Sequence, residues 1–402
     1  MRYKTAKIDD ICVKVISGGT PKTSVQSFYY PNEIPWLKTA EVNYCRIYDT
    51  EMYISKEGLA RSSAKIIPPN SIIVAMYGQG DTAGRVAINK IPLATNQACC
   101  NLIINQDIAD YEYVYYALST LYEKLVSLKN GGAQPNLNVG IIKSIDIPFP
   151  NLEIQHRISA ILSAYDSLIE NNQKQIKLLE EAAQRLYKEW FVDLRFPGYE
   201  DTRIVDGVPE GWIYRSISEF GEVVTGKTPS TARKEYYGGT VPFVKIPDMH
   251  NCIYPFITED TLTTEGANSQ RNKFIPKGSI MVSCIATVGL VNIAVESCQT
   301  NQQINSIILN EANNLYYIFF AMKRIKALLE GVGSNGATMT NVNKTKFSNL
   351  KVLLPINEII KAYNDFCKPI FQKIYDLSLA NIKLLQARDR LLPKLMSGEL
   401  EV

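Results

Sequence analysis

The sequence lacks any run of about 20 apolar residues, the length that a membrane-spanning helix requires. Its first residues, MRYKTAKIDD, also lack the apolar segment of a secretory signal. These absences favour a cytoplasmic protein over a membrane or secreted one. The chain has 402 residues, of which 46% are hydrophobic and 21% charged, so it has room for two or three domains with cores of their own.

Histidine is scarce, and the two histidines of the chain are His156 and His250. Neither lies near a set of cysteines or carboxylates in the sequence, so a surface or structural role explains each of them best. The eight cysteines include no CxxC pair. We therefore expect no metal site, and we expect reduced, mostly buried thiols.

A strong charge imbalance is also missing, because 43 Lys and Arg against 40 Asp and Glu leave a formal net charge of +3. A near-neutral chain neither favours nor excludes nucleic acid as a ligand, since a few basic side chains on one face suffice to meet phosphates. The sequence contains no Asn-Pro-Pro-Tyr or Asp-Pro-Pro-Tyr run of an adenine methyltransferase and no Asp…Glu-x-Lys set with a convincing nuclease context. We expect a binding protein without catalytic or cofactor-binding residues.

One stretch matches a nucleotide-binding pattern. Residues 221–228, GEVVTGKT, have the GxxxxGK[ST] spacing, in which backbone N–H groups surround a phosphate at the start of a helix. Pro229 follows directly, the residues before the pattern look helical, and no apolar run ending in Asp supplies a magnesium ligand. An NTP-dependent enzyme built on this loop is therefore a minor hypothesis.

The most prominent feature that is present is a long amphipathic segment. In residues 153–190, side chains of one face recur in steps of four and three, which is the spacing of a coiled-coil seam. The seam positions are Ile154, Ile158, Ile161, Tyr165, Leu168, Asn172, Gln175, Leu179, Ala182 and Leu186. A shift of 205 gives Ile359, Tyr363, Phe366, Ile370, Lys373, Leu377, Ala380, Leu384, Ala387 and Leu391. Two matched helices in one chain predict an intramolecular coiled coil.

The order of the chain predicts that these helices are antiparallel. A parallel pair would need a long return connection, and residues 191–212 are too few for one. Asn172 and Gln175 lie in the middle of the seam, where polar side chains fix the register of a helix pair. Pro369 is expected to kink the second helix or to split it after Cys367.

The repeat continues outside the helices, so the chain is expected to contain one globular unit twice. Residues 17–21, SGGTP, correspond to residues 225–229, TGKTP. Residues 34–38, IPWLK, correspond to 241–245, VPFVK, and the triplet Thr-Asn-Gln occurs at 95–97 and 300–302. The role of these triplets stays open, because amides between apolar segments often bond to backbone.

Each unit is expected to be mixed α/β, because short apolar runs alternate with Gly, Pro and Asn turns and with segments of helical spacing. The predicted strands are residues 72–75, 86–88, 99–104 and 145–147, and the predicted helices are residues 111–128 and 316–329.

The candidate ligand-binding residues are Lys, Arg, Asn, Gln, Thr and Tyr side chains on glycine-containing loops. Asn and Gln pair bidentately with adenine, Arg and Lys pair with guanine, and Lys and Thr bind phosphates. In the first unit the candidates are Lys22, Thr23, Lys38, Tyr77, Gln79, Arg85, Gln134 and Asn136. In the second unit they are Lys227, Lys245, Arg271, Thr287, Asn335, Thr338, Thr340 and Lys344. Taken singly, each is explained better as a solvated loop residue, and it is the pairing across the repeat that supports the group as a whole.

Several of these motifs together resemble the specificity subunit of type I restriction-modification systems, and the resemblance covers nearly the whole chain. They are GGTP followed by IPWLK, QPNLN before IPFP, EIQHRI at the start of the first helix, LYKEWFVDL at its end, and the closing RDRLLPKLMSGEL. The resemblance implies two target-recognition domains, residues 1–151 and 197–355, and two helical spacer regions, residues 152–196 and 356–402. The expected fold class is α+β, with an internal pseudo-two-fold repeat.

The resemblance also implies partners. Each domain would read one half of a split double-stranded DNA sequence, and the helices would set the gap between the halves and dock two methyltransferase subunits. S-adenosylmethionine would belong to those methyltransferase subunits, and ATP and Mg²⁺ to motor-nuclease subunits, so this chain would bind none of them. A coiled-coil scaffold whose globular ends bind other proteins is the alternative from another functional class.

Overall fold

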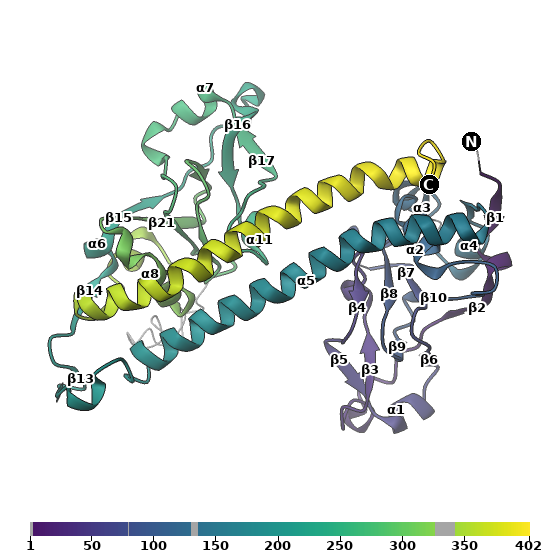
Figure 1. Cartoon of the computed structure of the whole chain (residues 1–402), viewed down its shortest axis with the longest axis horizontal. Coiled ribbons are helices and arrows are strands. Elements are labelled where there is room, and N and C mark those ends of the chain that lie inside the picture. The colour runs from purple at the N-terminus through teal and green to yellow at the C-terminus, as the bar shows by residue number, and fades with distance from the viewer. Residues whose placement is uncertain (1–2, 79, 130–135, 326–341) are drawn as a thin grey trace. The chain divides into compact units, whose positions relative to one another are not determined.

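The computed structural model describes residues 3–78, 80–129, 136–325 and 342–402. The chain divides into two compact units, the first made of Met1–Ile169 with Lys383–Val402 and the second of Glu170–Ile382. Each unit contains one mixed α/β domain and one stretch of each of the two long helices, α5 (Leu152–Phe191) and α11 (Asn357–Ser397) (Figure 1).

The two long helices run antiparallel within each unit, as the chain order predicted. In the first unit, Nη1 of Arg388 lies 2.6 Å from Oδ1 of Asp166. In the second unit, the Asn172 amide donates to Oδ1 of Asn381 at 2.8 Å, and the Tyr363 hydroxyl donates to the carbonyl of Ala183 at 3.0 Å. An early position of α5 therefore meets a late position of α11 in the first unit, and a late position of α5 meets an early position of α11 in the second.

Of the two outcomes expected for Pro369, a split after Cys367 is wrong, because α11 is helical from Asn357 to Ser397, and a kink stays a prediction. A proline removes the hydrogen bond to the carbonyl four residues earlier, here that of Asp365. Both Pro369 and Asp365 are exposed, so water can bond to this carbonyl and the helix continues.

The predicted seam is correct in period but wrong in part of its membership. Ile161, Leu168 and Phe366 were placed in the seam, yet they are 36%, 51% and 46% exposed. The fully buried side chains on the helices are instead those facing the domain cores, such as Leu162 and Phe371, each 0% exposed. Each helix packs against a globular domain as well as against the other helix, so its apolar stripe turns toward the domain.

The first domain is built from two main sheets and one pair of terminal strands. The larger sheet has the order β2 (Cys12–Ser17), β10 (Cys99–Ile104), β7 (Ile72–Ala75), β8 (Val86–Asn89), β4 (Arg46–Ile47). The second has the order β5 (Met52–Ile54), β3 (Ile34–Leu37), β9 (Leu93–Thr95), β6 (Ile66–Ile67). Strand β1 (Thr5–Lys7) pairs with β11 (Asp146–Pro148), so the two ends of the domain meet. Its helices are α1 (Lys56–Ala60), α2 (Tyr111–Ser119), α3 (Tyr122–Ser127) and α4 (Val139–Lys143).

The second domain repeats this topology. One sheet has the order β15 (Gly221–Thr225), β21 (Ile304–Leu309), β18 (Ile280–Ser283), β19 (Val291–Ile293). The other has the order β17 (Asp260–Leu262), β16 (Tyr237–Val244), β20 (Gln299–Thr300). Strand β14 (Ile213–Ser216) pairs with β22 (Lys351–Leu354), and β12 (Ile204–Val205) with β13 (Val208–Pro209). Its helices are α6 (Ile217–Phe220), α7 (Thr264–Asn268), α8 (Leu315–Lys323) and α10 (Lys344–Ser348).

Matching strand pairs confirm the predicted duplication. The parallel pair β3–β9 of the first domain has its counterpart in the parallel pair β16–β20 of the second. Where β6 pairs with β9, the second domain has a single bridge between Ile275 and Cys298. A tyrosine also occupies equivalent places in helices α2 and α8. The Tyr113 hydroxyl donates to the carbonyl of Pro148, and the Tyr317 hydroxyl donates to that of Leu353.

Most predicted elements are present, with shifted ends. The four strands predicted in the first unit correspond to β7, β8, β10 and β11. The helix predicted over residues 111–128 is two helices, α2 and α3, because the chain turns at Thr120 and Leu121. The helix predicted over residues 316–329 corresponds to α8, which ends at Lys323, and residues 326–329 lie outside the described part of the chain.

The core of each domain includes side chains from both long helices. In the first unit, Leu162 of α5 and Leu395 of α11 belong to the buried cluster under α2. In the second unit, Tyr187 of α5 and Phe371 of α11 lie in one cluster with Phe320 of α8. Each core is therefore completed by both helices.

All eight cysteines are free thiols, and five are buried, in line with the expectation from the sequence. Burial raises the pKa of the Cys252 and Cys284 thiols to about 11. Among the described residues, no helix is long and apolar enough to cross a membrane, and no three or more His, Cys, Asp or Glu side chains lie close enough to hold a metal ion.

Candidate nucleic-acid interface

The two glycine-containing loops of the repeat have the same backbone geometry. The Gly19 N–H donates to the carbonyl of Thr95 at 2.8 Å, and the Lys227 N–H donates to that of Thr300 at 2.9 Å. A Cβ atom on Gly18 or Gly226 would lie 2.2 Å from a carbonyl oxygen of the opposing triplet in both domains. Glycine is therefore required where each loop crosses its Thr-Asn-Gln triplet.

The triplets hold these loops in place, which answers the question that the sequence left open. The hydroxyl of Thr228 donates to Oε1 of Gln302 at 2.6 Å, and that of Thr20 donates to Gln97. A tyrosine fixes the end of the second loop, since the Tyr237 hydroxyl donates to the carbonyl of Pro229 at 2.8 Å. The first domain has the same contact between Tyr29 and Pro21.

This geometry does not suit a nucleotide. Residues 221–225 form strand β15, and Gly226 and Lys227 follow as a loop pinned to a neighbouring strand end. A phosphate-binding loop of this pattern requires a helix directly after the lysine, and the described chain has none there. The nucleotide-binding hypothesis is therefore not supported by the local structure.

Four of the sequence-predicted candidates are exposed on or beside these loops. Lys22 and Thr23 follow the first loop, and Lys227 lies within the second. Arg271 is exposed directly after Gln270, whose side-chain amide donates to the carbonyl of Lys227 at 2.6 Å. In each domain these side chains are open to an external ligand.

The lysines after β3 and β16 have different surroundings. Nζ of Lys245 lies 2.9 Å from Glu259 and 2.8 Å from Asp260, and these two carboxylates raise the pKa of Lys245 to about 12. Its counterpart Lys38 is half-buried, and its backbone N–H donates to Oε1 of Glu41 at 2.9 Å. The charge of Lys245 is already neutralised within the protein.

A second group of candidates gathers at the β7–β8 hairpin of the first domain. The Leu137 N–H donates to the carbonyl of Met76 at 3.0 Å, which brings Asn136 next to Tyr77 in this loop. Arg85 directly precedes the return strand β8, and its guanidinium donates to Oδ1 of Asn43 at 3.0 Å. The structure thus brings together two candidates, Tyr77 and Asn136, that are 59 positions apart in the sequence.

The second domain has the same arrangement at the β18–β19 hairpin. The Val342 N–H donates to the carbonyl of Cys284 at 2.8 Å, and the side chain of Asn305 donates to the carbonyl of Val342 at 3.2 Å. Thr287 is exposed in the hairpin, and Lys344 is exposed at the first position of α10. The remaining candidates lie outside the described residues: Gln79, Gln134, Asn335, Thr338 and Thr340.

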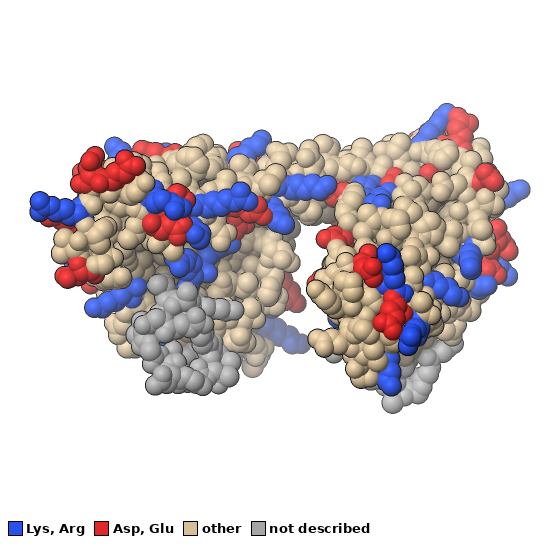
Figure 2. All heavy atoms as spheres, turned by 90° about the horizontal axis from the view of Figure 1, so that it is seen from below, with Lys and Arg blue, Asp and Glu red and all other residues tan. Residues whose placement is uncertain are grey.

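Basic and acidic side chains are interspersed over both units on the face that Figure 2 shows. This pattern agrees with the near-neutral composition of +3. A net charge of +3 attracts an anionic ligand only weakly, so binding of such a ligand would depend on the positions of particular Lys and Arg side chains.

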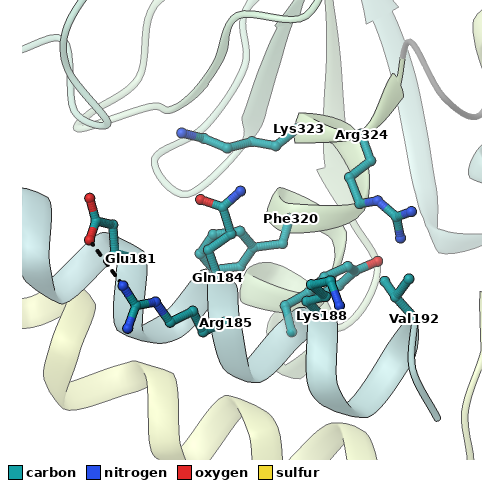
Figure 3. Close-up of a pocket in the computed structure, with 9 residues that line it drawn as sticks. Glu181, Gln184, Arg185, Lys188, Val192, Phe320, Lys323 and Arg324 are labelled. Atoms are coloured by element: carbon teal, nitrogen blue, oxygen red, sulfur yellow. Dashed lines mark ion pairs between the residues drawn. The ribbon is translucent and has the colours of Figure 1, made fainter.

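The sequence patterns did not single out a basic hollow in the second unit. It has a volume of about 450 Å³ and lies between α5 and the end of α8. Figure 3 shows Lys323 and Arg324 on the α8 side, with Gln184 and Lys188 on α5 and Phe320 at the wall. The signal in the sequence was the pair Lys323-Arg324 at the end of the apolar helix α8.

Most cations of this hollow already have carboxylate partners. Lys188 lies 2.5 Å from Asp193, and Arg185 lies 3.6 Å from Glu181 on the preceding turn of α5. Lys323 pairs with Glu180. The hollow therefore has less capacity for an anionic ligand than its lining residues suggest.

Comparisons with known proteins agree with the duplicated fold. The family model described as "Type I restriction modification DNA specificity domain" matches residues 2–181 and 209–383. The chain is 32% identical to the HindI specificity subunit of Haemophilus influenzae, over 74% of this chain and 79% of that protein. It is 29% identical to the MjaIX specificity subunit of Methanocaldococcus jannaschii, over 100% of this chain and 94% of that protein.

A solved structure has the same fold. The type I restriction-modification S subunit of Mycoplasma genitalium superposes with a TM-score of 0.61 at 15% identity, covering 98% of this chain and 96% of that one. This likeness concerns the fold alone.

Proposed function

The chain belongs to the family of type I restriction-modification DNA specificity subunits, and from this premise we propose that each of its two domains reads one half of a split DNA sequence. The observation that carries the proposal is the duplicated site: the same loop, pinned by the same triplet, occurs in both domains. The side chains presented beside the loops differ between the domains, so the two half-sequences would differ as well.

The recognition chemistry suits duplex DNA. In this proposal the exposed side chains Lys22, Lys227 and Arg271 contact phosphates, and Lys or Arg can also pair with guanine in the major groove. The hairpin groups around Asn136 and Thr287 add amide and hydroxyl groups, which pair with base edges. Phosphate contacts would position each domain, and base contacts would give its sequence preference.

We assign four functional segments to the chain, with domain limits at residues 1–151 and 197–355 and helical regions at 152–196 and 356–402. In this proposal the chain is a non-catalytic, cytoplasmic subunit. Two methyltransferase subunits dock on the helical regions and carry S-adenosylmethionine, while ATP and Mg²⁺ belong to motor-nuclease subunits that join the complex.

The alternative function, a scaffold that binds only proteins, makes an opposite prediction about salt. DNA binding releases counterions, so affinity for duplex falls steeply with salt in proportion to the number of phosphate contacts. A protein scaffold would show no such duplex binding. Binding of the full chain, assembled with its methyltransferase subunits, to a duplex that contains its methylated motif therefore tests the proposal.

The salt dependence also discriminates among the candidate lysines and arginines. In the variant with the exposed cations changed to Met, the slope of log affinity against log salt should fall by about 0.9 for each phosphate that the protein no longer binds. The substituted residues are Lys22, Lys227, Arg271 and Lys344. Titration of a labelled duplex between about 50 and 200 mM salt measures the slope.

Lys245→Met is the matched control, because Glu259 and Asp260 already neutralise this lysine. Its slope should equal that of the unmodified protein. An unchanged slope in the multiple variant, or a reduced one in Lys245→Met, would contradict the assignment of the exposed cations to phosphates.

The helical regions provide a second test of the proposal. Seven residues inserted into each helix, beside Asn172 and Asn381, keep the phase of the seam and add about 10 Å of helix. The gap in the methylated motif should lengthen, by about three base pairs at 3.4 Å per base pair. Sequencing of methylated adenines in genomic DNA measures the gap.

The control insertion places the same seven residues in the exposed turn of the β12–β13 hairpin, at Asp206. This change leaves both helices intact, so the gap should stay as it was. A constant gap after the helix insertions would refute the spacer role while leaving DNA recognition by the domains in place.

A further inference from the structure

The repeat allows α5 and α11 to be compared position by position. At an offset of 205, their buried side chains coincide: Ile158 corresponds to Tyr363, and Leu162 corresponds to Cys367, each 0% exposed. The two helices are thus equivalent in their packing. Against this background, the positions at which they differ in chemistry are informative.

The first difference lies beside α2. In the first unit, the Asp166 carboxylate accepts a hydrogen bond from the Tyr116 hydroxyl at 2.5 Å and from the Arg388 guanidinium at 2.6 Å. The carboxylate and guanidinium groups are largely buried, with 12% and 19% of their side chains exposed. Arg46, a neighbouring cation of the same domain, is bound to Glu112 and to Ser167. Asp166 therefore depends on Arg388 for its charge partner.

The equivalent position in the second unit is apolar throughout. Asp166 corresponds to Phe371, Arg388 to Ala183 and Tyr116 to Phe320. Phe371 and Ala183 are each 0% exposed, and the rings of Phe371 and Phe320 lie 5.9 Å apart. A polar cluster in one unit thus stands where the other has an aromatic one.

The second difference is the amide pair. Asn172 donates to Asn381 at 2.8 Å, and Asn381 is 8% exposed. Their counterparts are Leu377 and Ile176, which are apolar. The contacts Asp166–Arg388 and Asn172–Asn381 therefore have no counterpart in the other half of the repeat, because the equivalent side chains are apolar.

This pattern has a consequence for association between copies. If the α5 helices of two copies paired with each other in the same geometry, Ala183 would stand where Arg388 stands now, and Asp166 would lose its cation. If two α11 helices paired, Phe371 would stand where Asp166 stands, and the Arg388 guanidinium would be buried among aromatic rings. In the α5 pair the largely buried Asp166 carboxylate loses its charge partner, which is strongly unfavourable. In the α11 pair Arg388 loses Asp166 and keeps Asp389 of its own helix, at 2.8 Å, as a carboxylate partner.

We propose that the contacts Asp166–Arg388 and Asn172–Asn381 make helix pairing selective, so that each half of the repeat associates with the unlike half and not with the like half of a second copy. Polar residues in a coiled-coil seam select partners in this way, at a cost in stability. The preference keeps two different domains on every particle, which an apolar seam between equivalent helices would not guarantee.

The test uses the full chain, folded and then cut in the exposed hairpin at residues 199–207 through an inserted protease site. Cut protein with and without ¹⁵N label is mixed in urea below the unfolding midpoint until labelled and unlabelled halves have exchanged. Native mass spectrometry then counts pairs of unlike and like halves. In the unmodified protein, the ratio of unlike to like pairs should exceed its statistical value by roughly 100-fold or more, the effect of one unpaired buried charge.

The decisive variant gives both helices the apolar residues of their counterparts, Asp166→Phe and Asn172→Leu in α5 with Arg388→Ala and Asn381→Ile in α11. Its halves should approach the statistical ratio of like and unlike pairs. The exchanged pair Asp166→Arg with Arg388→Asp should keep the preference for unlike halves, which makes the proposal testable even if the fourfold variant fails to fold.

The matched control removes an ion pair that lies within one helix, Glu181→Ala with Arg185→Ala, and should keep the selectivity of the unmodified protein. Statistical pairing in the unmodified protein would overturn the proposal. So would full selectivity in the fourfold variant, or loss of selectivity in the exchanged pair.

Discussion

Replacement of residues 211–355 by the matching domain of the Haemophilus influenzae relative should change one half of the methylated motif completely and leave the other half unchanged. The expected result follows from independent reading by the two domains, whose loops are pinned by contacts within each domain. The measurement is sequencing of methylated adenines in cells that produce the chimera with its methyltransferase subunits.

The limits of the exchange follow from the strand pairing at the ends of the domain. Strand β14 pairs with β22 from Ile213–Leu354 to Ser216–Lys351. The first and last strands of the domain are therefore neighbours, and both junctions of the graft lie at the same place. The side chains that face the helices must be kept, since Tyr317 and Phe320 of α8 pack on Tyr187 of α5. A graft that keeps them leaves the framework unchanged.

The reciprocal graft is the control. Exchange of residues 5–148, which the β1–β11 pair closes in the same way, should change the other half of the motif. A change in both halves after either graft would mean that the domains do not read independently, and the proposed division of labour would be wrong.

The second large effect concerns stability. Phe371→Ala should lower the free energy of unfolding by about 3–5 kcal/mol, because truncation of a buried aromatic side chain loses its burial and leaves a cavity. Phe371 is 0% exposed and lies between Phe319, Phe320 and Tyr316, with ring centroids 4.4–5.9 Å away. Urea unfolding followed by circular dichroism measures the loss.

Phe366→Ala is the matched control on the same helix. The sequence pattern placed Phe366 in the seam, but its side chain is 46% exposed, so its truncation should change stability by no more than about 0.5 kcal/mol. Equal losses in the two variants would show that the helix is rotated from the orientation described above, with Phe366 in the core.

The features that could be predicted from the sequence are those that depend on residues close together in the chain or on comparison of the chain with itself. A helical period over residues 153–190 needs nothing but its own side chains to be recognised, and a repeat is a comparison of the chain with itself. The pattern of α11 also continued through Pro369, although the proline suggested a break. The cost of one proline on an exposed face is small beside the packing of a 41-residue helix, and only the structure showed that this face is exposed.

The roles of single polar residues were not local. Lys38 and Lys245 occupy equivalent places in the repeat, yet Lys245 is neutralised by Glu259 and Asp260, which lie 14 and 15 positions further along the chain. Asn136 and Tyr77 are brought together by a hydrogen bond between loops that are distant in sequence. No spacing rule in a single sequence reports such contacts.

The sequence by itself determined that the chain is one module written twice, with a long amphipathic helix after each copy. Only the tertiary structure decided which face of each helix is buried, which cations remain exposed, and that Asp166 meets Arg388. The physical reason is that periodicity depends on neighbours along the chain. Burial and charge pairing depend instead on side chains that are far apart in the sequence and meet only in the folded protein, as Asp166 and Arg388 do.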